Sequence, residues 1–116
     1  MSDALRLHGV EMYVSSTDAQ GVVGAETRIR FVQKGLRVFG RYAGGAVRRG
    51  RLVGTLSKGA LAFRYAQIEA SGELHAGRSQ CEVFQTATGC LRVVERFSWT
   101  TRDGRGVNVF DECDYS

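Results

Sequence analysis

The sequence predicts an all-β fold, a single domain over residues 1–116 that forms an eight-stranded antiparallel up-and-down β-barrel. Eight runs of residues alternate between apolar and polar side chains, as strands do. The seven connections between them all contain glycine, whereas proline is absent and no run has helical periodicity. Short connections make neighbours in sequence neighbours in space, and closure removes the exposed edges of an open sheet. An open or sandwiched sheet is the alternative.

The eight runs are recognised by period-two alternation and by the turn residues between them. In order they are 5–15, 25–33, two runs within 36–56, 61–65, 73–85, 91–99 and 107–113. The pair within 36–56 is joined by Gly44 and Gly45, because paired glycines reach the positive φ values of a tight hairpin turn. A helix there would cost about 1 kcal/mol for each glycine relative to alanine. The first run changes phase at Gly9, a suitable position for a β-bulge.

Alternation also predicts which side chains face the barrel interior. Most of these positions hold large apolar residues, and some hold glycine. They are Ile29, Phe31, Leu36, Val38, Gly40, Tyr42, Leu52, Gly54, Leu56, Leu61, Phe63, Tyr65, Leu91, Val93, Phe97 and Trp99. The run 91–99 alternates most clearly, whereas 73–85 is so polar that its inward face stays open.

Composition indicates a soluble globular protein, with 43% hydrophobic and 24% charged residues. No apolar run approaches the roughly 20 residues that span a bilayer, and the N-terminus lacks the form of a signal peptide, so we expect a cytoplasmic protein without membrane contact. Cys81, Cys90 and Cys113 form no CxxC pair and are expected to be free thiols. His8 and His75 lie near no second Cys or His in sequence, so we expect no metal and no other cofactor.

Four short motifs resemble a family of small bacterial proteins that are commonly labelled N-acetylglutamate synthase. They share glycines and aromatic residues at strand spacing, and the resemblance covers about residues 24–112. The motifs are Gly40-x-Tyr42-x-Gly44-Gly45-x-Val47-x-x-Gly50-x-Leu52, Phe63-x-Tyr65, Gly72-Glu73-x-x-x-Gly77-Arg78 and Glu95-x-Phe97-x-Trp99. The resemblance brings no established catalytic residues with it.

The label itself implies features that the chain lacks. N-acetylglutamate synthases resemble the GNAT acyltransferases, mixed α/β proteins whose pyrophosphate loop reads Gln/Arg-x-x-Gly-x-Gly/Ala before a helix. Residues 20–25, QGVVGA, are one residue too long for this loop and are followed by a predicted strand. A helix N-terminus is what binds the phosphates of such a cofactor. We therefore expect the label not to describe the activity of this chain.

Glu95 is the first candidate site residue. It lies between Val93 and Phe97 on a strongly apolar face, so its carboxylate is expected to point into the barrel. A buried lone charge must be paired, hydrogen-bonded or protonated, and Arg78 is the candidate partner if its strand has the right phase. A structural network that fixes the barrel register is one interpretation. A polar anchor or general acid/base in a cavity is the other.

Three aromatic residues are expected to line the same interior: Tyr42, Tyr65 and Trp99. Each has an apolar body and one polar tip, which suits a ligand pocket and an ordinary core alike. Gln67 continues the face of Tyr65 and is predicted at the barrel mouth, where a hydrogen bond to a turn is the alternative. His75 is expected at the surface or the mouth, not as a catalyst.

Space for a ligand depends on the inward glycines. Gly40 and Gly54 leave room where a filled core would want bulk, and Gly50 is a further candidate for the same role. The alternative is that they permit close approach of the backbone, or let aromatic rings lie flat across them. Sequence alone does not decide between a cavity and a filled barrel.

Arginine dominates the charge of the chain. Fourteen arginines and two lysines, against twelve acidic residues, give a net charge of +4. Seven of the arginines are predicted to point outward from four consecutive strands: Arg28, Arg30, Arg37, Arg41, Arg49, Arg51 and Arg64. Such a wall suits phosphates or an acidic partner, but stacking of bases needs exposed aromatic rings, and only Phe39 is placed for that. A solvated face is the simpler interpretation, and nucleic acid is not expected.

These observations lead to an ordered set of hypotheses. The preferred one is a barrel of the streptavidin or lipocalin kind that binds a small organic ligand, with Tyr42, Tyr65, Gln67, Arg78, Glu95 and Trp99 at the site. The comparison with those folds rests on architecture and does not identify the ligand. The second hypothesis is an enzyme that uses Glu95 as acid or base in the same cavity. The third is a nucleic-acid or protein-binding module on the basic face, and a homodimer stays open in each case.

Overall fold

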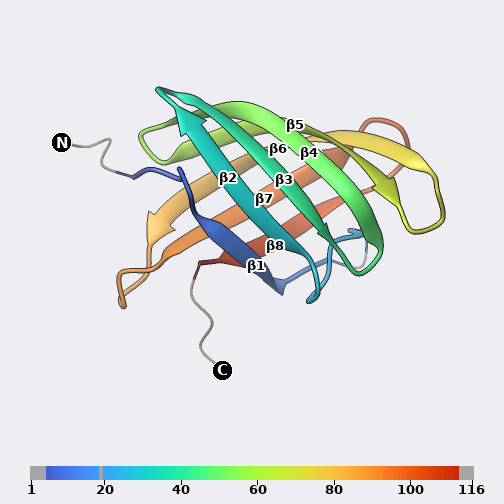
Figure 1. Cartoon of the computed structure of the whole chain (residues 1–116), viewed down its shortest axis with the longest axis horizontal. Helices are drawn as coiled ribbons and strands as arrows, with labels where there is room; N and C mark the ends of the chain where they lie inside the picture. Colours follow the sequence, from blue (N-terminus) through green and yellow to red (C-terminus); the bar gives the residue numbers. More distant parts are fainter. Residues whose placement is uncertain (1–4, 19, 113–116) are drawn as a thin grey trace.

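The computed structural model describes residues 5–18 and 20–112, which form a closed antiparallel barrel of eight strands (Figure 1). The strands are β1 (Glu11–Ser16), β2 (Arg28–Lys34), β3 (Arg37–Gly44), β4 (Val47–Ser57), β5 (Ala60–Glu69), β6 (Leu74–Gln85), β7 (Leu91–Trp99) and β8 (Arg105–Asp111). The described residues contain no helix, and hence none that is long and apolar enough to cross a bilayer. The predicted fold is confirmed.

Each strand pairs with its neighbours in sequence, and β1 closes the barrel against β8. In the closing pair Val14 lies opposite Phe110, and the register shifts between Val14 and Ser16. The predicted hairpin joins β3 to β4, with Gly44 and Gly45 at φ values of 123° and 63°. Residues that have a Cβ rarely adopt such φ values. Glycine at these two positions therefore sets the turn that the barrel needs.

The core follows the predicted alternation. Every inward position of β7 is buried, Glu95 included, and β2, β3, β4 and β5 also bury every second residue over most of their length. Leu36 is an exception, because it lies in the turn between β2 and β3 and is 57% exposed. Its place on the predicted inward face was wrong, since strand alternation does not extend into a two-residue turn.

The polar strand β6 turns Gly77, Ser79, Cys81 and Val83 inward. Arg78 therefore points outward, beside Arg64 of β5 and Ser98 of β7. The prediction that Arg78 pairs with Glu95 inside the barrel is wrong. The physical reason is the strand period of two, which places residue 78 on the opposite face from Ser79.

The cysteines differ from the expectation in part. Cys81 is a free thiol on the inward face of β6, and burial raises its pKa. Cys90 is disulfide-bonded, so the expected free thiol is wrong at that position. Cys113 lies outside the described residues. Disulfides persist mainly in oxidising compartments, so this bond does not support the expected cytoplasmic location, which stays a prediction.

The two ends of the barrel are covered by different segments. Residues 5–10 cover one end, which we call the sealed end, and they hydrogen-bond to β2 through Gly9 N to Phe31 O and Phe31 N to Val10 O. The connection 17–27 between β1 and β2, of which residue 19 lies outside the described residues, covers the other end, the mouth end, with Gly21, Val22 and Val23. The predicted break at Gly9 is present as a turn with φ of 75°. It separates the covering segment from β1.

Candidate functional site: the cavity at the mouth end

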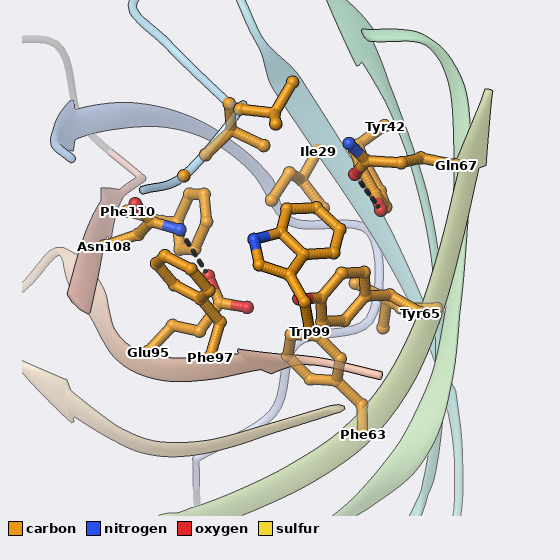
Figure 2. A pocket seen from close by; sticks show the side chains of 14 residues that line it. Ile29, Tyr42, Phe63, Tyr65, Gln67, Glu95, Phe97, Trp99, Asn108 and Phe110 are labelled. Atoms are coloured by element: carbon orange, nitrogen blue, oxygen red, sulfur yellow. Dashed lines mark hydrogen bonds between the residues drawn. The ribbon is translucent and has the colours of Figure 1, made fainter. Parts of the chain in front are cut away.

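A small cavity lies inside the barrel beneath the connection 17–27 (Figure 2). Its volume is about 30 Å³, enough for roughly one or two water molecules. Most of the lining is aromatic or aliphatic, with three polar side chains among it. The lining residues are Gly21, Val22, Val23, Ile29, Tyr42, Leu52, Phe63, Tyr65, Gln67, Glu95, Phe97, Trp99, Asn108 and Phe110.

The inward glycines do not enlarge this cavity. A Cβ at Gly50 would lie 2.2 Å from Cζ of Tyr42, so the tyrosine ring covers the glycine. A Cβ at Gly40 would lie 2.8 Å from Cγ of Leu52, and one at Gly54 would meet the backbone of β5 at 1.9 Å. These glycines do not leave a cavity. Instead, they allow side chains to pack over them and strands to approach closely, which was the alternative interpretation. The interior is mostly filled.

Glu95 lies at the polar centre of the cavity wall, only 5% exposed. Ser79 Oγ donates a hydrogen bond to its Oε2 at 2.5 Å, and Asn108 Nδ2 donates to its Oε1 at 2.9 Å. Thr17 Oγ1 donates in turn to Asn108 Oδ1 at 2.6 Å. Burial raises the pKa of the Glu95 carboxyl above its usual range, and the two hydrogen bonds offset this in part. The predicted inward carboxyl is present, but its partners are neutral.

Sequence reasoning missed Ser79 and Asn108. In β8 the apolar residues Val107 and Val109 suggest an inward face, yet Val107 is 42% exposed and Asn108 is buried. The register explains this, because Asn108 lies directly opposite Glu95. Phe110 was the available signal, since a large aromatic at the end of the strand places Asn108, two positions earlier, on the same inward face.

Tyr65 brings an incomplete hydrogen bond to the cavity. Its side chain is 8% exposed, and its hydroxyl has no hydrogen-bond partner among the described residues. The hydroxyl oxygen lies over Gly77, 2.3 Å from the position that a Cβ on this glycine would take. Burial, with the nearby Glu95 carboxylate, raises the pKa of Tyr65, so the hydroxyl keeps its proton. An O–H donor is therefore left unused beside the cavity.

A second network joins the mouth end. Tyr42 donates to Gln67 Oε1 at 2.9 Å, and Gln67 Nε2 donates to Glu69 Oε2 at 2.9 Å (Figure 2 shows the first bond). Glu69 also accepts from the Arg102 guanidinium, which lies 4.4 Å from the centre of the Trp99 ring. The predicted mouth position of Gln67 agrees with this placement. Unlike Tyr65, Tyr42 has a satisfied hydroxyl.

The connection 17–27 is fastened to this mouth by polar contacts. Trp99 Nε1 donates to Gln20 O at 3.0 Å, and Arg105 N donates to Gln20 Oε1 at 2.9 Å. Val22 and Val23 are half-buried against the core. Together these contacts close the cavity with a cover made of two small apolar side chains and a few hydrogen bonds.

His75 lies at the mouth, as predicted. Its ring nitrogens are 2.8 Å from Glu73 Oε1 and 2.8 Å from Thr101 Oγ1, and its ring packs at 6.2 Å from that of Trp99. The hydrogen bond from His75 lowers the pKa of the exposed Glu73 carboxyl. Within residues 5–18 and 20–112, no three His, Cys, Asp or Glu side chains are grouped to hold a metal ion.

Comparison with known proteins gives one family. The family model described as "Avidin-like protein" matches residues 5–113. No curated protein and no solved structure matches the chain. The matched span contains all eight strands and every residue of the cavity wall.

Proposed function

The chain belongs to the avidin-like protein family, and from this membership and the chemistry of its cavity we propose that the barrel binds one compact organic molecule at the mouth end. Proteins of this family bind small ligands such as biotin. The observation that carries the proposal is the unpartnered hydroxyl of Tyr65. A buried donor without an acceptor costs about 1–3 kcal/mol, and a ligand that supplies the acceptor recovers this free energy.

The lining defines the kind of ligand. Tyr65 donates to an acceptor such as a carbonyl oxygen, while Glu95 offers its remaining lone pairs to an N–H or O–H group. Trp99, Phe97 and Phe110 surround these two groups with apolar surface. We therefore expect a compact, largely apolar molecule that carries one acceptor and one donor close together.

Access to the site requires movement of the connection 17–27. Pockets for drug-sized ligands usually enclose about 300 Å³ or more, whereas this cavity has a volume of about 30 Å³. Displacement of Val22 and Val23 would open the interior without breaking the sheet. We expect the ligand-bound barrel to differ from the form described here mainly in this connection.

The other predicted site residues take supporting roles in the proposal. Tyr42 and Gln67 satisfy each other, so they form a wall of the site and donate nothing new to a ligand. Trp99 contributes its ring face, because its N–H is already given to Gln20. Arg78 is left out of the site because it lies on the outer face.

An enzyme in the same cavity, with Glu95 as acid or base, is less well supported than binding. Both carboxyl oxygens already accept hydrogen bonds, from Ser79 and Asn108, which suits a fixed anchor more than a group that exchanges protons. The N-acetylglutamate synthase label is not proposed, since the described residues offer no helix to bind a cofactor pyrophosphate. A homodimer stays a prediction.

Two variants of matched size test the proposal. Native mass spectrometry of the purified protein should show a bound small molecule, and biotin and a library of compact carbonyl compounds are then titrated by calorimetry. Tyr65→Phe should weaken binding of any hit about tenfold, because it removes the free donor. Tyr42→Phe, which removes a donor already in use, should change the affinity by less than about threefold. Equal losses in the two variants, or no ligand in either experiment, would overturn the proposal.

A further inference from the structure

The outer surface of β2 to β6 carries a continuous group of arginines, which we call the arginine face. It consists of the outward side chains of Arg30, Arg41, Arg51, Arg64 and Arg78. Arg30 lies directly opposite Arg41, and Arg41 opposite Arg51. Arg64 and Arg78 form a third direct pair, offset from this row because Arg64 lies opposite Val53. Figure 1 shows β2 to β5 side by side, and the registers of these strands place the arginines as a stepped band across them.

Like charges at directly opposed strand positions destabilise a sheet. None of these five arginines forms an ion pair within the described part of the chain. Residues 28–81 contain eleven Lys and Arg residues but only two acidic residues, Glu69 and Glu73. Glu11, opposite Arg30 on β1, is the one acidic neighbour in the register of this band. The repulsion is therefore left largely uncompensated.

An apolar row lies beside the arginines. Val32 on β2 and Val53 on β4 each lie opposite Phe39 on β3, and Val32, Phe39 and Val53 are 39%, 39% and 51% exposed. They stand two positions along each strand from the arginine row, about 7 Å away. A surface groove is lined by both rows, with Arg30, Arg41, Arg51 and Arg64 beside the three apolar side chains.

We propose that this groove binds a segment of a partner protein, an amphipathic helix with an acidic stripe next to an apolar stripe. Neighbouring side chains on a helix surface lie about 5–6 Å apart between Cβ atoms, which is close to the spacing of the two rows. The arginines supply the charge complementarity, and the apolar row supplies contact area. This proposal is independent of a ligand in the cavity.

Two other occupants fit the face less well. A second copy through the same face would bring two arginine bands together, which repel. Single-stranded nucleic acid binds on several exposed aromatic platforms, whereas of the two aromatic residues that line this groove Tyr65 is buried and only Phe39 is exposed, with valines as its neighbours.

The test uses a fluorescein-labelled peptide of about 18 residues, long enough to form a helix, with a Glu stripe beside a Leu stripe. Fluorescence anisotropy should show saturable binding to the full chain, weakening at least about fivefold between 50 and 250 mM salt. Arg41→Glu places an acid between Arg30 and Arg51 and should weaken binding about tenfold or more. The same variant should unfold at an equal or higher urea concentration, because it relieves repulsion.

Matched controls separate the face from net charge. Arg6→Glu makes the same charge change at the sealed end and should change the affinity by less than about twofold. Phe39→Ser should lower the affinity for the peptide at least about threefold, whereas purely electrostatic binding would be unaffected by this substitution. Circular dichroism confirms the fold of each variant.

Absence of peptide binding at 50 mM salt would overturn the proposal, as would equal losses in Arg41→Glu and Arg6→Glu. Tighter binding of a twenty-nucleotide oligothymidylate than of the peptide would assign the face to nucleic acid. Tighter binding of vesicles that contain phosphatidylserine would assign it to an anionic lipid surface.

Discussion

The sealed end and the mouth end of the barrel are closed by opposite kinds of contact. At the sealed end, Leu7 is completely buried, its N–H donates to Gln33 Oε1 at 2.8 Å, and Gly9 hydrogen-bonds to β2. At the mouth end, the cover consists of half-buried Val22 and Val23 with side-chain hydrogen bonds at Gln20. The first closure is part of the core and the second rests on it.

This difference separates stability from access. A fully buried leucine contributes several kcal/mol to folding, whereas a half-buried valine contributes much less, because only part of its surface leaves water on folding. The mouth can therefore open at low cost while the rest of the barrel stays folded. Unused polar groups lie at the same end as the weaker cover, which is where a ligand would enter.

The largest expected effect is at the sealed end. Leu7→Ala should lower the free energy of unfolding by about 3 kcal/mol, through lost burial and the cavity left behind. Val23→Ala at the mouth should cost about 1 kcal/mol or less. Urea unfolding followed by the fluorescence of Trp99 measures both. Equal losses would contradict the distinction between the two ends.

The two tyrosines of the cavity should respond differently to the same substitution. Tyr42→Phe leaves Gln67 Oε1 without its buried donor and should cost about 1–2 kcal/mol. Tyr65→Phe removes a hydroxyl that has no partner and should leave the stability of the ligand-free protein unchanged or slightly higher. Urea midpoints of both variants, compared with the wild type, check this. A clear loss in Tyr65→Phe would show that its hydroxyl is satisfied.

Glu95→Gln should change how the free energy of unfolding depends on pH. Because burial raises the pKa of Glu95, the folded chain binds more protons than the unfolded chain between the ordinary value of 4.5 and the raised one. The free energy of unfolding of the wild type should therefore fall as the pH rises through this window. In Glu95→Gln that contribution should vanish. Urea midpoints from pH 5 to 8 measure the slope, and parallel curves for the two proteins would contradict it.

The smallest energies are those of local opening. Amide hydrogens in residues 20–24 should exchange at least about tenfold faster than those in residues 7–10. The reason is that the mouth cover adds few backbone hydrogen bonds to the sheet. Hydrogen exchange with mass spectrometry resolves the two peptides. Slower exchange at the mouth than at the sealed end would remove the basis for ligand entry there.

Much of this architecture is predictable from the sequence because the strand period is local. The alternation from Leu91 to Trp99 identified the interior position of Glu95 without knowledge of its neighbours. The partners were less accessible, since a polar strand such as β6 has two faces of similar hydropathy. Asn108 was hidden for the related reason that valines occupy the outer face of β8.

The cover of the mouth was not predictable at all. Residues 17–24 have no period, and the place of this segment depends on contacts far along the chain, such as that of Gln20 with Trp99. Cavity size was equally unpredictable from the sequence, because an inward glycine does not indicate which side chain occupies the space above it. Only the register of neighbouring strands shows that Tyr42 lies across from Gly50.

That tyrosine-on-glycine arrangement has an evolutionary consequence. Positions 42 and 50 act as one unit, and so do positions 65 and 77, because any side chain at the glycine would occupy the volume of the ring. Across homologous barrels we expect each pair to be inherited or exchanged together. A homologue with a larger residue at position 50 should have a smaller residue than tyrosine at position 42, and it would therefore lack one wall of the cavity.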